Sequence, residues 1–198
     1  MAECTICAQR KAKRLCPALN TMICPVCCGA KRKTEIQCFP SCEYLRQGEE
    51  YQRTRTISEL VTSSFTDKSH DIFKDEQVIE FIYPLELFFV QQFYGDWTVN
   101  DADIYDALAE IYSYRTGMIK ELRPANRCQE LIFMKFNEIN QKTPKIEEEL
   151  KTKAILRVLK SIKDSSGGVL GHRNYLEMIY SQSHSDGTWN HLFRDKSD

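Results

Sequence analysis

The feature that most constrains the fold of this 198-residue chain is its first 42 residues, which hold eight of its nine cysteines. Two pairs have the spacing Cys-x2-Cys and a third has Cys-x3-Cys, and the segment contains no histidine. The eight residues are Cys4, Cys7, Cys16, Cys24, Cys27, Cys28, Cys38 and Cys42. Thiols paired at these spacings are typical zinc ligands, and eight of them can supply two tetrahedral four-thiolate sites. The segment has few apolar residues, so we expect it to fold around metal rather than around a core.

Disulfide bonds and an iron–sulfur cluster are the alternatives to zinc. The opening residues show no basic stretch followed by an apolar one, and no run approaches the roughly 18–20 apolar residues of a membrane span. We therefore expect a cytoplasmic protein whose thiols stay reduced, which disfavours disulfides. An iron–sulfur cluster is disfavoured because the thiols form well-separated pairs.

The division of the ligands between two zinc ions follows from taking the thiols as successive pairs. The first predicted site contains Cys4, Cys7, Cys24 and Cys27, and the second contains Cys16, Cys28, Cys38 and Cys42. The side chains of adjacent Cys27 and Cys28 diverge, which suits binding to different metals. One complete site with a partial second site is the alternative.

The order of these cysteines, with a proline after Cys16 and after Cys24, resembles the small interleaved two-zinc modules of the B-box, HIT-finger and MYND kind. Residues 1–45 are also similar to prokaryotic proteins that join an N-terminal cysteine cluster to a helical remainder. The pattern departs from the three modules in lacking a histidine ligand and in the Cys27–Cys28 pair. The resemblance implies a role in contacts with other proteins.

Charge divides the chain into a basic and an acidic part. Residues 1–56 carry ten Lys or Arg against five Glu, whereas the rest carries 17 basic and 23 acidic residues. The basic residues beside the zinc ligands are Arg10, Lys11, Lys13, Arg14, Lys31, Arg32 and Lys33. They could bind phosphate groups of a nucleic acid or a partner protein. A solvated surface is the interpretation we favour, because no aromatic residues are interleaved with them and no recognition helix is evident.

The remainder has the three- and four-residue apolar periodicity of helices. We predict a connector helix and linker over residues 46–70, an all-α bundle of about five helices over 71–182, and a flexible tail over 183–198. The connector helix is capped by Ser41 and reaches about Arg53, and the linker lies at 62–70.

Within the predicted bundle, capping residues, prolines and glycines mark helix boundaries or breaks. The first helix begins at Asp71 or Asp75, and Pro84 should kink or break it. Asn100 should cap the second helix, and Pro124 should open the third. Thr143 with Pro144 should open the fourth, which ends at Gly167 and Gly168, and a last helix spans about residues 172–181.

Nothing in the chain predicts a catalytic site. The histidines are scattered, and Cys128 lies on an apolar helical face, where a buried thiol is expected. Fully thiolate-ligated zinc leaves no position for an activated water. We therefore predict a non-enzymatic adaptor whose cysteine-rich head contacts a partner protein. A nucleic-acid-associated factor that uses the basic clusters is the alternative, and a redox sensor or enzyme that uses Cys27 and Cys28 is the third.

Overall fold

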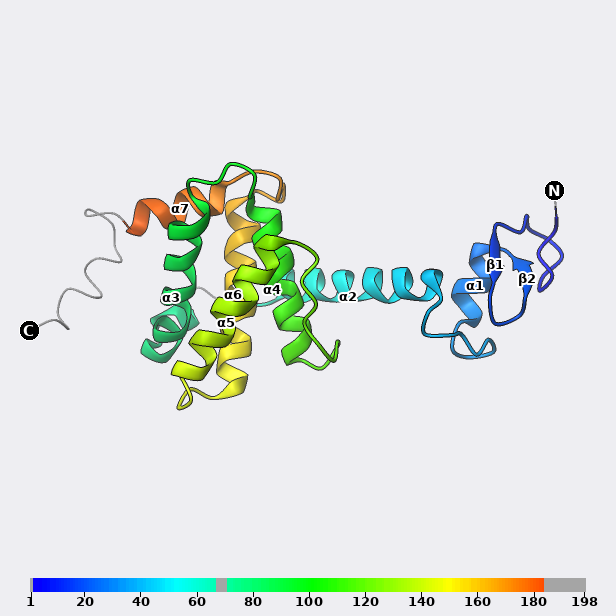
Figure 1. Cartoon of the computed structure of the whole chain (residues 1–198), viewed down its shortest axis with the longest axis horizontal. Coiled ribbons are helices and arrows are strands. Elements are labelled where there is room, and N and C mark those ends of the chain that lie inside the picture. The colour runs from blue at the N-terminus through cyan, green and yellow to red at the C-terminus, as the bar shows by residue number, and fades with distance from the viewer. Residues whose placement is uncertain (1, 67–70, 184–198) are drawn as a thin grey trace, which may run out of the picture. The chain divides into compact units, whose positions relative to one another are not determined.

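The computed structural model describes residues 2–66 and 71–183 of the chain (Figure 1). The chain divides into two compact units, Met1–Thr56 and Ile57–Asp198. The elements of the first unit are β1 (Arg14–Cys16), β2 (Thr21–Ile23), α1 (Pro25–Lys31) and most of α2 (Glu43–Ser63). The second contains the 3-10 turn η2 (Ile72–Lys74), α3 (Glu76–Phe93), α4 (Asp101–Arg115), α5 (Arg127–Lys142), α6 (Glu148–Ser165) and α7 (Asn174–Ser183).

The described residues thus form a mostly helical protein with seven α-helices, more than the predicted connector helix and bundle of about five. Helix α1 of the cysteine-rich unit was not predicted, and α2 extends well beyond the expected end near Arg53. As a result, residues 62 and 63 of the predicted linker are helical. The rest of that linker lies partly, and the predicted tail almost wholly, outside the described residues.

The first unit is built on a two-stranded antiparallel hairpin that the sequence did not reveal. Strands β1 and β2 pair Leu15 with Met22, and each strand is only three residues long, too short for a visible alternation. Asn20 takes a positive φ of 51° in the connecting turn, a conformation that asparagine tolerates. The apolar core of this unit is small, since apart from the cysteines its buried aliphatic side chains among the described residues are Ile23, Ile36 and Leu45.

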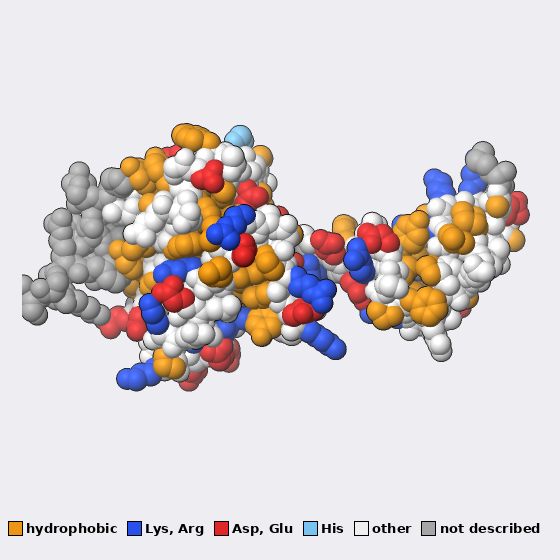
Figure 2. Space-filling view, viewed as in Figure 1, with side chains coloured by type: hydrophobic (Ala, Val, Ile, Leu, Met, Phe, Trp, Pro, Cys, Tyr) orange, Lys and Arg blue, Asp and Glu red, His pale blue; other side chains and the backbone are white. Residues whose placement is uncertain are grey.

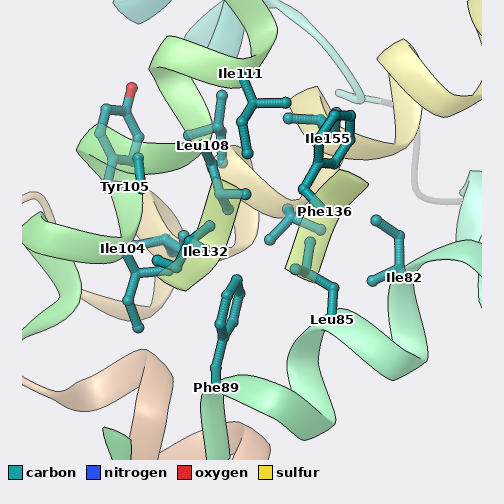
Figure 3. Packing of buried hydrophobic residues seen from close by; sticks show 14 of the residues in the cluster. Ile82, Leu85, Phe89, Ile104, Tyr105, Leu108, Ile111, Ile132, Phe136 and Ile155 are labelled. Carbon is teal, nitrogen blue, oxygen red and sulfur yellow. The ribbon is translucent and has the colours of Figure 1, made fainter. Parts of the chain in front are cut away.

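The second unit has one continuous core between its helices. Side chains from α3, α4, α5 and α6 interdigitate there, as Figure 3 shows for Leu85, Phe89, Leu108, Ile132 and Ile155. Ile57 and Val61 add the last turns of α2 to the same core.

Pro84 does not break α3, although a kink or a break was predicted there. The helix runs without interruption from Glu76 to Phe93, and Asp75 caps its start. Proline removes one backbone hydrogen bond, which costs about 3 kcal/mol in a helix interior. The burial of Phe81, Leu85 and Phe89 on either side of it offsets this cost.

The predicted cap of α4 is confirmed, whereas two other helix starts are wrong. The Asn100 side chain accepts from the N–H groups of Ala102 and Asp103, and the Asp103 carboxylate accepts in turn from the Asn100 N–H. Helix α5 begins at Arg127, capped by Asn126, rather than at Pro124. Helix α6 begins at Glu148 rather than near residue 144, because residues 144–147 form a turn before it.

Two buried or half-buried charges attach α7 to the other helices. Fully buried Asp101 accepts hydrogen bonds from the N–H groups of Tyr175 and Leu176, at 2.8 and 3.2 Å. Arg173 donates to four carbonyl groups between residues 93 and 99 and so satisfies the end of α3. None of the helices in the described ranges is long and apolar enough to cross a membrane.

Candidate metal centre

The first pair of cysteines lies on a tight loop at the start of the chain. The Ala8 N–H donates to the Cys4 carbonyl at 2.8 Å, and the Cys4 N–H donates to the Arg10 carbonyl, also at 2.8 Å. The Thr5 N–H donates to the Met22 carbonyl of β2 at 3.2 Å. These bonds fold the Cys4–Cys7 loop back on itself and hold it against the hairpin.

The second pair lies at the start of α1, directly after β2. Cys24 is the N-cap residue of this helix, Pro25 occupies its first turn, and the Cys24 sulfur accepts from the Cys27 N–H at 3.3 Å. The Cys24 N–H in turn donates to the Cys4 sulfur at 3.2 Å. Backbone N–H groups thus face the sulfur atoms, an arrangement that stabilises thiolates.

The structure brings these four cysteines to one point. The sulfur atoms of Cys4, Cys7, Cys24 and Cys27 all lie within 4.8 Å of one another, and three of the four residues are buried. All nine cysteines are free of disulfide bonds. A Zn–S bond of about 2.3 Å with tetrahedral angles places sulfur atoms about 3.8 Å apart, so a small contraction would complete the shell. The four thiols could therefore hold a metal ion, and they are the first set that the sequence predicts.

The thiols of this cluster differ in acidity in the absence of a cation. Burial raises the pKa of Cys4, but N–H groups of Cys7, Cys24 and Ile6 outweigh it and lower this pKa to about 6. Burial, together with the neighbouring thiols, raises the pKa of Cys27 to about 12. Four adjacent thiolates repel one another, so full deprotonation requires a cation at the centre.

Arg10 contributes to this cluster, a role that the sequence did not indicate. Its Nη1 lies 3.9 Å from the Cys7 sulfur. Hydrogen bonding to Cys24 and the charge of Cys7 raise the pKa of Arg10. A four-thiolate zinc centre carries a net charge of −2, so this guanidinium is placed to offset part of it. The signal available in the sequence was a cation three residues after a predicted ligand.

The second predicted set surrounds a separate small space. Cys16, Cys28, Cys38 and Cys42 all line one cavity of about 10 Å³, a volume close to that of a single water-sized sphere. In the described part of the chain, however, only the first set has its sulfur atoms within 4.8 Å of one another. The second zinc site therefore stays a prediction.

Most of the predicted basic residues already have contacts within the unit. Lys31 pairs with Glu35 and Lys33 with Glu49. The Arg14 guanidinium lies 4.7 Å from the centre of the Tyr44 ring.

Arg32 is also engaged within the unit. It donates to the Cys28 carbonyl at 3.4 Å and lies against Gly48, where a Cβ would meet its guanidinium at 1.5 Å. Lys11 and Lys13 lie just before β1 and are exposed. Most of these cations thus contact other residues of the same unit, and phosphate binding stays a prediction.

Cys128 belongs to the second, helical unit. It is 9% exposed, and burial raises its pKa to about 12. A protonated buried thiol agrees with the expectation from its apolar helical face.

The comparisons with known proteins add no assignment. The chain matches no protein-family model, no curated protein and no solved structure. The resemblance to two-zinc modules therefore depends on the cysteine pattern alone.

Proposed function

We propose that the protein is a zinc-binding adaptor whose first unit binds a partner protein, with zinc in a structural role. The observation that carries the proposal is the convergence of Cys4, Cys7, Cys24 and Cys27 within 4.8 Å in a unit with a very small apolar core. Structural zinc supplies about 10–16 kcal/mol to comparable small modules, enough to fold them. Four thiolates fill a tetrahedral shell, so such a zinc has no open position for catalysis. This supports a non-enzymatic role.

Exposed apolar side chains support a partner protein as the ligand of this unit. Leu15 and Met22 lie opposite each other across the hairpin, on the same face, and are 56% and 37% exposed. Val26 at the start of α1 and Phe39 before α2 are also more than half exposed. Figure 2 shows hydrophobic side chains gathered on the visible face of this unit. Exposed apolar groups at this density are characteristic of interaction surfaces.

The second zinc is part of the proposal. The four remaining thiols of residues 1–42 line one space of atomic size, and ordinary thiol rotation would bring sulfur atoms closer to its centre.

The first test is zinc stoichiometry on the full chain by native mass spectrometry. Two zinc ions are expected for the wild type, one for Cys24→Ser, and two for Cys128→Ser as the matched control. A wild type that binds no zinc, or a Cys24→Ser variant that keeps the full amount, would contradict the proposed metal centre.

The second test separates partner binding from folding. The double variant Leu15→Ser with Met22→Ser is expected to retain zinc and helical content but to lose a partner that co-purifies with the wild type. Met134→Ser removes an equally exposed apolar side chain, 62% accessible on α5, and serves as the control. If the hairpin variant kept the partner and the α5 variant lost it, the assignment of the binding surface to the first unit would be wrong.

A further inference from the structure

A cavity in the helical unit has the features of a small-molecule site. It lies between η2, α3, α6 and α7 and has a volume of about 280 Å³. Its walls are mainly apolar and include Phe73, Ile79, Ile82 and Ile179. Ligand pockets range upward from about 300 Å³, so this cavity suits a compact molecule rather than a peptide.

One buried carboxylate lines this cavity with only one of its two oxygens in a hydrogen bond. Glu86 of α3 is only 6% exposed. One of its oxygens accepts from the hydroxyl of Tyr175, at 2.5 Å. Its other oxygen accepts no hydrogen bond from any residue in the described ranges, although a carboxylate offers about four acceptor positions. This oxygen is not among the fully buried polar atoms that lack a partner, so it is open to the cavity and can accept from a bound donor.

The other charges at the cavity are already balanced. The Arg157 guanidinium donates through Nε and Nη2 to Asp71, at 3.0 and 2.6 Å, and through Nη1 to Ser161 at 2.6 Å. It also stacks on Phe73, with 4.6 Å to the ring centre. Arg157 and Asp71 thus form a neutral pair, which leaves Glu86 as the unbalanced group. The cavity is therefore complementary to a cation and not to an anion.

We propose that this cavity binds a small organic amine, whose apolar body packs against the aliphatic and aromatic walls and whose ammonium group donates to the free oxygen of Glu86. This site is independent of the metal centre and of the proposed adaptor role. The hydrophobic body supplies burial, and the charge-assisted hydrogen bond supplies the preference for an amine over an acid or an alcohol.

Proton release should accompany binding. Burial raises the pKa of Glu86 to about 7, against the opposing effects of the Tyr175 hydroxyl and the Arg157 charge. Tyr175 stays protonated, because its pKa is raised well above the usual value, and the Arg157–Asp71 pair stays ionised, because the pKa of Asp71 is lowered. An ammonium group would fix Glu86 in its charged form, so about half a proton leaves at pH 7. The affinity should then rise with pH through 7.

The test is isothermal titration of the full chain with 2-phenylethylamine, in two buffers of different ionisation enthalpy. Phenylpropanoate and 2-phenylethanol serve as the acid and alcohol of similar shape, and isoamylamine and cyclohexylmethylamine extend the amine series. We expect at least one amine to bind at least tenfold more tightly than the acid and the alcohol, with a heat that depends on the buffer.

Two variants assign the effect to the carboxylate. Glu86→Gln retains an acceptor for Tyr175 and is expected to weaken amine binding at least tenfold and to abolish the buffer dependence. Glu80→Gln removes an exposed carboxylate from the same helix and should bind as the wild type does. The proposal is wrong if no amine of the series binds at millimolar concentration, if acid and amine bind equally, or if a folded Glu86→Gln variant binds unchanged.

Discussion

Replacement of Glu86 by Gln should change the pH dependence of stability in a defined direction. Glu86 is buried and its pKa rises from 4.5 to about 7 in the folded protein, with burial as the main cause. Below pH 4.5 the carboxyl is protonated in both the folded and the unfolded chain, so it contributes no penalty. As the pH rises from 4.5 to 7, the unfolded chain ionises first, and the folded state loses stability relative to it.

The magnitude follows from the size of the shift. A change of about 2.5 pKa units, at 1.36 kcal/mol each, corresponds to about 3 kcal/mol. The Glu86→Gln variant has no such ionisation. The difference in unfolding free energy between variant and wild type should therefore grow in favour of the variant by about 3 kcal/mol between pH 4.5 and pH 8. Most of this change should appear by pH 7.

Urea unfolding of the zinc-saturated full chain, followed by circular dichroism at 222 nm, measures this difference. The signal reports mainly on the second unit, which contains five of the seven described α-helices. Glu80→Gln controls for the loss of one negative charge from α3. A difference between Glu86→Gln and wild type that stayed constant over this pH range would refute the reasoning. A Glu80→Gln variant with the same trend would show that net charge, and not burial, is the cause.

Three further outcomes are expected. Asp101→Ala leaves two buried N–H groups at the start of α7 without an acceptor and should reduce the unfolding free energy by about 3 kcal/mol. Asp101→Asn retains one oxygen and should reduce it by about 1 kcal/mol. Equal losses for the two variants in urea unfolding would contradict the capping role. Pro84→Ala restores an N–H donor for the Glu80 carbonyl within α3 and should raise the unfolding free energy by about 1–3 kcal/mol. A loss of stability would show that the proline ring is required for packing. Cys128 should resist alkylation by iodoacetamide at pH 8 until urea unfolds the second unit, because burial keeps this thiol protonated. Peptide mass spectrometry measures the labelling, and rapid labelling of the native protein would disprove the burial of Cys128.

Local patterns in the sequence predicted those elements whose causes are local. The capping box at Asn100 depends on groups three residues apart, and it forms as expected. The C-terminal end of α6 is similar, since Gly167 and Gly168, just after the helix, adopt the positive φ that few other residues tolerate. The thiols of Cys4, Cys7, Cys24 and Cys27 converge because two short segments of the chain each present a pair of ligands.

Other elements depended on contacts that the sequence does not show. Pro84 remains inside α3 because side chains distant in the sequence bury both of its flanks. The start of α5 at Arg127, capped by Asn126, was not predicted, because Pro124 is also suited to the first turn of a helix. The hairpin between Arg14 and Ile23 consists of strands too short to produce an alternating pattern.

The sequence by itself therefore determined a thiol-rich first unit and a helical remainder, because ligand spacing and apolar periodicity act over a few residues. Only the tertiary structure decided which groups meet across long separations. Glu86 and Tyr175 are 89 residues apart, and Asp71 and Arg157 are 86 residues apart, yet together they define the chemistry of one cavity. Glu86 stands four residues after Ile82 and three before Phe89, on the apolar face of α3, but its partner Tyr175 reaches it only when the whole unit folds.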